Sequence, residues 1–322
     1  MRYTDWGERS PRWAGIRSEI TRVHGVRVGY LAAGAAPGAP PNAVPHLLVH
    51  PMAGSATIWL DVMRALSAYG PVFAPDMPGT MAGETIAPRP NAVRPETNAR
   101  FLRAFAATLG LDRYVLHGWS MGGLVALMHA DIAPRHVVRM VLTAPPLPGP
   151  LPPDEVVFWQ TVGRAVLLAG PPLARVLLRV FGPFLYDAKI RRYSDPASLA
   201  AGGRLDVLGG DPSRIAPETV AVWAEELAEM RSRHANMGPA LSAFAATLAA
   251  MFIRPARLRE VIERVAAPVT LLYGDRDPLV QTAAIDDVTS RRPDWRVRVF
   301  PGAGHLLPLE VTAEYAAAAA QP

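Results

Sequence analysis

Ser120 stands between two symmetrically placed glycines in the stretch HGWSMGGL, residues 117–124. A serine nucleophile needs an exposed hydroxyl, a base that takes its proton, and donors for the oxyanion that forms on the substrate. The spacing of Gly118, Ser120 and Gly122 is typical of a tight strand-to-helix turn, because glycines let the strand and the helix approach closely. An apolar run precedes this turn and a helical pattern follows it. We therefore predict that Ser120 is a nucleophile.

The base for such a serine would be a histidine, and the chain contains eight. His305 differs from the others because it follows FPGAG directly after the last predicted strand, and loops at strand ends commonly carry catalytic groups. The other histidines have structural interpretations, such as His24 in a hairpin turn and His117 inside a buried strand. We predict that His305 is the base.

An acid that orients the histidine is expected between the serine and the histidine along the chain. The stretch LLYGDRDPLV, residues 271–280, ends a predicted strand and offers Asp275 and Asp277. The loop after the preceding strand, TAPPLPGP, contains no carboxylate. Two aspartates here could also simply shape a turn, and the residues alone leave the choice between them open.

The elements that must position these groups alternate along the chain. Apolar runs and periodicity predict strands at 18–23, 26–34, 46–50, 71–79, 113–120 and 137–144, and helices at 58–66, 96–110 and 121–132. Such alternation indicates crossover connections and a mostly parallel sheet.

A proline cluster at 145–155 interrupts this alternation, and helical periodicity without a convincing strand follows. The alternation returns with a helix at 257–266, strands at 268–274 and 295–300, and a helix at 310–320. The simplest architecture is an α/β core, residues 1–146 and 256–322, that is interrupted by a helical insertion over 147–255.

Composition narrows the classes of function. The chain has 322 residues, of which 50% are apolar and 19% charged, and it contains no cysteine, which excludes disulfides and a cysteine nucleophile. The net charge of +5 comes from scattered arginines, so we expect no nucleic-acid partner. We expect no signal peptide and a cytoplasmic location.

The apolar stretch 165–185 carries two arginines, so we expect no membrane span, although a membrane-associated lipase stays open as a third interpretation. Composition leaves the oligomeric state undetermined.

Together these motifs resemble the α/β-hydrolase superfamily, of the type whose active site is covered by a lid. The resemblance rests on five short stretches in the expected order: HPMAG (50–54), DMPG (76–79), GWSMGG (118–123), GDRDP (274–278) and GAGH (302–305). It implies an α/β-hydrolase fold, with 147–255 as the lid, and it selects Asp277 over Asp275. It also implies that the backbone N–H groups of Met52 and Met121 form the oxyanion hole. The family usually has glycine where this chain has Pro51, which has no N–H to donate.

The resemblance implies acyl chemistry, because related dehalogenases and epoxide hydrolases use a carboxylate at the nucleophile position. We expect hydrolysis of an apolar carboxylic ester, lactone or thioester through an acyl-enzyme, with no metal and no cofactor. The alternatives are C–C bond hydrolysis, acyl transfer, or ligand binding without turnover. Five residues are candidates for the wall of the substrate pocket: His50, Trp119, Trp159, Trp223 and Phe244.

Overall fold

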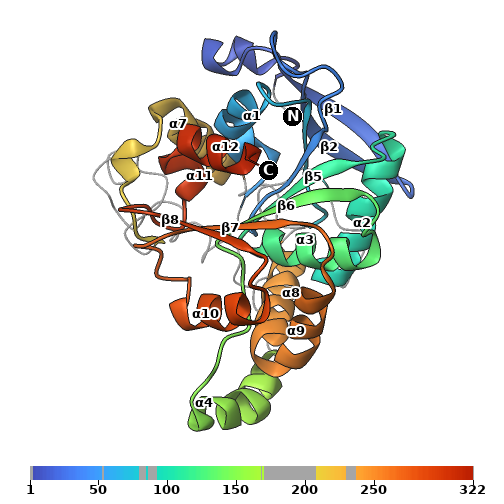
Figure 1. Cartoon of the computed structure of the whole chain (residues 1–322). Helices are drawn as coiled ribbons and strands as arrows, with labels where there is room; N and C mark the ends of the chain where they lie inside the picture. Colours follow the sequence, from blue (N-terminus) through green and yellow to red (C-terminus); the bar gives the residue numbers. More distant parts are fainter. Residues whose placement is uncertain are drawn as a thin grey trace.

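A computed structural model describes residues 3–52, 54–79, 85, 93–167, 169, 208–229 and 237–321. Within these residues, eight strands form one sheet (Figure 1), in the order β1-β2-β4-β3-β5-β6-β7-β8. The strands are β1 (Ile16–Val23), β2 (Val26–Ala33), β3 (His46–Val49), β4 (Val72–Pro75), β5 (Tyr114–Trp119), β6 (Val137–Thr143), β7 (Val269–Gly274) and β8 (Arg296–Phe300). The β1–β2 and β2–β4 pairs are antiparallel and all other pairs are parallel.

The central strands are apolar because helices cover both of their faces. Successive residues of β3 point in opposite directions, so that Leu47 belongs to one hydrophobic cluster and Leu48 to the other. The β1–β2 hairpin closes through His24 and Gly25, whose φ angles of 47° and 80° suit the twist of a two-residue hairpin turn. The predicted fold, a mostly parallel sheet flanked by helices, is confirmed.

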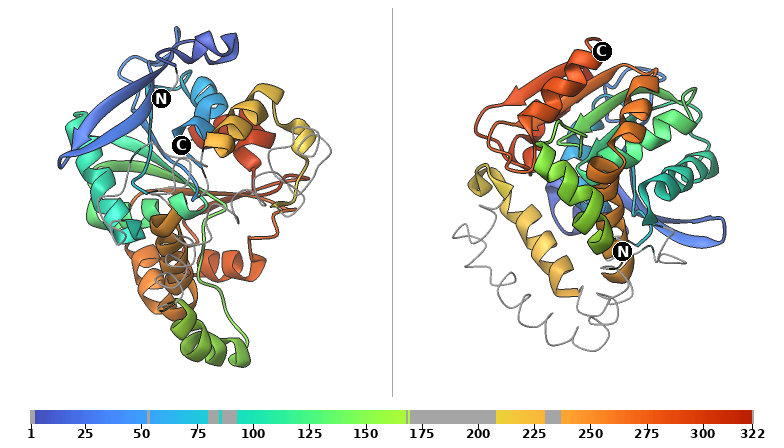
Figure 2. Two further views of the ribbon diagram at one scale, coloured as in Figure 1. Left: turned by 180° about the vertical axis from the view of Figure 1, so that it is seen from behind. Right: turned by 90° about the horizontal axis from the view of Figure 1, so that it is seen from below.

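The helices form two layers on the sheet. The helices and helical turns are η1 (Trp6–Glu8), η2 (Pro11–Trp13), η3 (Ala56–Trp59), α1 (Leu60–Leu66), α2 (Pro95–Thr108), α3 (Met121–Ile132), α4 (Pro153–Phe158), η5 (Trp159–Gly163), η7 (Pro212–Arg214), α7 (Pro217–Glu229), α8 (Met237–Leu248), η10 (Ala249–Ile253), α9 (Pro255–Arg264), α10 (Thr282–Arg291), α11 (Leu307–Glu310) and α12 (Thr312–Ala320). Side chains of α1, α11 and α12 fill one cluster, and side chains of α2, α3, α9 and α10 fill the other. Figures 1 and 2 show these two groups on opposite sides of the sheet.

Helix α3 is the most enclosed helix of the described chain. Every residue from Met121 to Ala130 is buried, and α3 packs against α2, α9 and β5. A helix that is apolar on all sides requires cover on all sides. Its first turn, which follows Ser120, is therefore held rigidly against the sheet.

Every regular element that the structure describes within the predicted insertion is a helix or a helical turn. Helix α4 buries none of its residues and projects from the body of the protein (Figure 1). Helix α7 is instead anchored to the core, because Asp61 of α1 accepts a hydrogen bond from Thr219 and Arg9 pairs with Glu225 at 2.8 Å. Residues 168, 170–207 and 230–236, which include most of the apolar stretch 165–185, lie outside the described residues. The domain boundaries at 146 and 255 stay a prediction.

Two further features bear on the predictions. Helix α10 forms at Thr282–Arg291, where the sequence analysis placed no element, and it buries Ala284, Ile285 and Val288. Within the described residues, no single helix is long and apolar enough to cross a membrane. One pair of helices, bent by 88° between Pro239–Ile253 and Pro255–Arg264, meets the length and composition criteria together.

Candidate active site

The backbone of Ser120 has an unusual conformation, with φ at 53° and ψ at −124°. Positive φ is costly for a residue with a side chain and persists only where the surroundings impose it. Here the Ser120 N–H donates to the Thr143 carbonyl of β6 at 2.8 Å, and the Ser120 carbonyl accepts from the Gly123 N–H at 2.8 Å. Strand and helix together therefore hold this turn, and the serine remains partly exposed at its tip.

Gly118 and Gly122 each occupy a position with no room for a side chain. A Cβ on Gly118 would lie 2.5 Å from the Gly122 carbonyl oxygen and 2.8 Å from the Ala126 side chain. A Cβ on Gly122 would overlap the carbonyl oxygens of Val49 and His50, at the end of β3. The two glycines thus let β5 approach α3, and let α3 approach the loop that follows β3.

That close approach brings together the two predicted oxyanion donors. Met121 is the first residue of α3, and Met52 packs against it in a small apolar cluster. Neither backbone N–H donates a hydrogen bond to any residue that the structure describes. The first N–H groups of a helix have no partner within the helix and attract negative charge. Both groups are therefore available to an oxyanion.

The loop that carries Met52 is held by His50. The His50 ring donates from Nδ1 to the Pro51 carbonyl at 2.8 Å and accepts at Nε2 from the Met77 N–H at 3.1 Å. Burial lowers the pKa of His50, although the nearby Asp76 acts in the opposite direction, so the ring is neutral. Both ring nitrogens are used, and His50 joins the loops after β3 and β4. These contacts give His50 a structural role, and its predicted place in the substrate pocket stays a prediction.

His305 and Asp277 form a buried pair. The His305 Nδ1 lies 2.7 Å from Asp277 Oδ2, and the second carboxylate oxygen, Oδ1, accepts from the Leu279 N–H at 2.8 Å. Asp275 points elsewhere and accepts from the Gly302 N–H at 2.7 Å. With its proton on Nδ1, the ring leaves Nε2 unprotonated and able to act as a base. Among the described residues, no hydrogen bond joins Ser120 to His305, and such bonds often tighten only when substrate binds.

A model of the alpha/beta hydrolase family matches residues 47–318. This chain belongs to the alpha/beta hydrolase family. The match covers β3 to β8 and includes the turn at Ser120, the Asp277 loop and the His305 loop.

Characterised members of the family resemble the chain at moderate identity. The chain is 26% identical over 207 residues to N-formylmaleamate deformylase of Pseudomonas putida, covering 64% of this chain and only 61% of the length of that enzyme. It is 25% identical to pimeloyl-[acyl-carrier protein] methyl ester esterase of Nitrosomonas europaea, over 80% of this chain and 87% of that one. A hydrolase of 2-hydroxy-6-oxononadienedioate from Paraburkholderia phymatum is 30% identical over 148 residues, which cover 44% of this chain and 50% of that one.

Solved structures of the family show the same fold. The epoxide hydrolase VrEH1 from Vigna radiata superimposes with a TM-score of 0.68 at 17% identity, covering 95% of this chain and 97% of that one. The thioesterase domain from the curacin biosynthetic pathway gives a TM-score of 0.65 at 16% identity, covering 95% of this chain and 99% of that one. At these identities the likeness concerns the fold alone.

In this alpha/beta hydrolase, Trp119 belongs to the core and is not part of a pocket wall. It is 0% exposed and packs edge-on against Trp59, at 5.6 Å between ring centroids. Its indole N–H donates to the His305 carbonyl at 2.9 Å. The residue before the predicted nucleophile thus fixes the main chain of the predicted base, a contact that the sequence analysis did not anticipate.

The other predicted pocket residues lie in separate places. Trp159 of η5 stacks on Phe252 with ring centroids 4.5 Å apart, while Phe244 of α8 is 45% exposed. Trp223 of α7 lines a small cavity next to Gly54, in the loop that carries Met52. Trp223 therefore shares this cavity with a loop of the candidate site.

Sequence analysis missed the residues that pack against Met121, directly after Ser120. Val93 and Ala243 form an apolar cluster with Met121, and Met52 covers it. Val93 precedes α2 and Ala243 lies on α8, so nothing in the sequence near Ser120 indicated them. In the described residues, no three His, Asp or Glu side chains gather in a way that could hold a metal ion.

Proposed function

We propose that this alpha/beta hydrolase cleaves an apolar carboxylic ester, lactone or thioester through an acyl-enzyme on Ser120. The observation that carries the proposal is a serine at positive φ on the turn from β5 into α3, beside two backbone N–H groups that have no partner among the described residues. Such a turn presents the hydroxyl for attack on an acyl carbon. The matching relatives include an esterase and a deformylase, which supports acyl chemistry.

In the proposed mechanism, the Ser120 hydroxyl attacks the substrate carbonyl while His305 Nε2 takes its proton. Asp277 holds the His305 ring through Nδ1 and stabilises the positive charge that the ring acquires. His305 then gives the proton to the leaving group, and the acyl group remains on Ser120. Water, deprotonated by the same histidine, releases the acid and regenerates the serine.

The N–H groups of Met52 and Met121 stabilise the oxyanion in both steps. They are fixed before the substrate arrives, since α3 is rigidly buried and His50 holds the loop after β3. Donors that need no reorganisation contribute about 2–4 kcal/mol each to the lowering of the barrier. Pro51 supplies no donor, but its carbonyl closes the turn by accepting from the Gly54 N–H at 3.0 Å.

The proposed substrate is a small molecule with an uncharged, apolar acyl group. Met121, the residue after Ser120, packs in a cluster with Val93, Ala243 and Met52, whose side chains are all apolar. An apolar wall disfavours a charged acyl chain, because a charge that loses its water needs a partner.

The first test uses a fluorophosphonate probe, which reacts with an activated serine. Wild-type protein should be labelled on Ser120, as mapped by mass spectrometry, while Ser120→Ala and His305→Ala should not be labelled. Ser120→Ala should also lower hydrolysis of p-nitrophenyl esters by about 10⁴-fold or more without changing the thermal midpoint markedly. Hydrolysis that survives Ser120→Ala would refute the proposal.

Hydrolysis of a C–C bond is the second candidate, favoured by the match to the 2-hydroxy-6-oxononadienedioate hydrolase. A panel that pairs esters with vinylogous 1,5-diketone substrates separates the two reactions by their kcat/KM values. Acyl transfer is tested in the same assay by adding an alcohol or thiol acceptor and measuring how products divide between acid and new ester. The substrate that gives the higher kcat/KM decides between the candidates.

A further inference from the structure

A short segment of the predicted insertion lies against the two loops that carry Asp277 and His305. This segment, residues 208–211, is called the strap below. The Leu208 carbonyl accepts a hydrogen bond from the His305 N–H at 2.8 Å. At the next position, a Cβ on Gly209 would overlap the Arg276 carbonyl oxygen, one residue before Asp277. The strap therefore touches both loops of the predicted histidine–aspartate pair.

Glu310, the last residue of α11, joins the strap to the His305 loop. Its Oε1 accepts from the Gly304 N–H at 3.0 Å, and its Oε2 accepts from the Asp211 N–H at 2.9 Å. The residue is 7% exposed. A buried carboxylate is costly unless donors satisfy it, and hydrogen bonds to a charged acceptor are stronger than neutral ones.

Glycines leave just enough room for this bridge. Gly210 has φ at 77°, and a Cβ there would lie 2.5 Å from Glu310 Oε1 and 2.5 Å from the Gly304 nitrogen. A Cβ on Gly304 would lie 2.6 Å from the Gly210 nitrogen. Strap, His305 loop and carboxylate are therefore in direct contact, and a shift of one must move the others.

We propose that Glu310 is a positioning residue for His305. It fixes the backbone at Gly304, directly before His305, and ties it to the strap, which itself holds the His305 N–H. The ring then meets Asp277 in one orientation. This inference rests on the proposed function for its kinetic consequence, but the position of the ring can be measured without any substrate.

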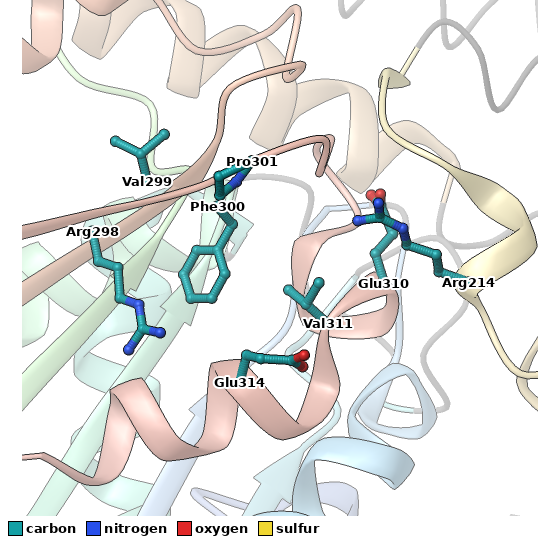
Figure 3. A pocket seen from close by; sticks show the side chains of 8 residues that line it. All are labelled: Arg214, Arg298, Val299, Phe300, Pro301, Glu310, Val311 and Glu314. Carbon is teal, nitrogen blue, oxygen red and sulfur yellow. The ribbon is translucent and has the colours of Figure 1, made fainter.

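The substitution Glu310→Gln removes the bridge with little change in volume. A carboxylate accepts at both oxygens, whereas a glutamine amide has one accepting oxygen and a nitrogen that only donates. In the variant, the N–H of either Gly304 or Asp211 would therefore face the amide nitrogen. The matched control is Glu314→Gln. Figure 3 shows both glutamates at the same surface pocket: Glu314 lies on α12, one helical turn away, and is exposed.

The test combines kinetics with the NMR signal of one ring proton. In protein labelled with ¹⁵N-histidine, the signal lost in His305→Gln identifies the Nδ1–H that Asp277 accepts. In Glu310→Gln this signal should shift or broaden, and kcat for a p-nitrophenyl ester should fall about 10- to 100-fold, as expected for a displaced catalytic group. KM should stay within about twofold, because substrate binding does not involve the displaced ring.

Glu314→Gln should leave the signal, kcat and KM as in the wild type. If Glu310→Gln folds poorly, Glu310→Asp is the second variant. It keeps the charge, but its side chain is too short to reach the N–H groups of both Gly304 and Asp211, so it should still shift the His305 Nδ1–H signal. An unchanged ring signal in the folded Glu310 variant would overturn the proposal, as would an equal change in Glu314→Gln. A displaced signal in a protein that neither reacts with fluorophosphonate nor cleaves esters would support the positioning role and refute the proposed function.

Discussion

At the scale of single residues, the two candidate acids differ in where their oxygens lie. Asp277 is buried and divides its carboxylate between the His305 ring and the Leu279 N–H. Asp275 is exposed and closes the loop at Gly302. A carboxylate that accepts from Nδ1–H selects the tautomer in which Nε2 can act as a base, and only Asp277 makes this contact.

The asparagine variants test this difference. Asp277→Asn should lower kcat by about 10³–10⁴-fold, because an amide can donate to Nδ1 and stabilise the wrong tautomer. Asp275→Asn should lower kcat by less than about threefold, since it affects a surface loop and leaves the ring contact in place. The measurement is kcat with a p-nitrophenyl ester at fixed pH. A larger loss in Asp275→Asn than in Asp277→Asn would move the orienting role to Asp275.

At the scale of elements, the site depends on how tightly strand β5, helix α3 and the loop after β3 pack. The proposed nucleophile and one proposed oxyanion donor come from the turn between β5 and α3, and the other proposed donor comes from the β3 loop. Helix α7 supports that loop from outside, because the Glu226 carboxylate accepts from Ser55 Oγ at 3.0 Å and from Thr57 Oγ1 at 2.5 Å. Helix α7 of the predicted insertion therefore holds the loop that follows β3.

Gly122→Ala tests the contact between α3 and the β3 loop. The added Cβ would overlap the Val49 carbonyl, so α3 or the loop must shift. We expect a loss of about 2–3 kcal/mol in the free energy of unfolding and a reduced rate of fluorophosphonate labelling. Gly34→Ala is the control, because its Cβ would enter open space. If urea unfolding and labelling of Gly122→Ala match those of Gly34→Ala, the close contact is not required.

At the scale of the whole molecule, neutral histidines are built into the core on both faces of the sheet. His46 Nδ1 lies 2.9 Å from His117 Nε2, and His117 Nδ1 lies 3.2 Å from the Tyr315 hydroxyl. His129 hydrogen-bonds the Tyr114 hydroxyl at 2.6 Å. Burial lowers the pKa of His46 and of His129 to about 4, and it lowers that of His117 as well.

These histidines predict that acid destabilises the protein below about pH 6.5. Between about pH 6.5 and pH 4, these histidines are protonated in the unfolded chain, whereas buried His46 and His129 stay neutral in the folded protein. The unfolded state therefore binds more protons, and a fall in pH favours unfolding. Within this pH range, each such histidine lowers the free energy of unfolding by at most about 1.4 kcal/mol for each pH unit of acidification. Urea unfolding between pH 7.5 and 4.5 measures the slope of the unfolding free energy against pH.

The substitution His46→Gln should reduce this slope, whereas His24→Asn in the exposed hairpin turn should not. Equal slopes in the wild type and both variants would contradict the conclusion that buried His46 makes the protein sensitive to acid.

The sequence by itself determined those features that depend on neighbours along the chain. The five residues from Gly118 to Gly122 dictate a strained turn, since only glycines fit on both sides of it. The alternation of apolar runs and helical periods was enough to predict the parallel sheet, and the loop after the last strand was enough to single out His305. Helix α10 could have been found as well, because Ala284, Ile285 and Val288 already have helical spacing.

Only the tertiary structure decided which distant groups meet. The residues alone left Asp275 and Asp277 open, and two predicted pocket residues, His50 and Trp119, proved to hold loops together. The bridge through Glu310 reaches Asp211 across 99 positions of the chain. Such contacts depend on the order of strands in the sheet and on where residues 208–211 lie against the loops that carry Asp277 and His305. Neither leaves a periodic pattern in the sequence, because the groups that interact there are single residues on separate loops.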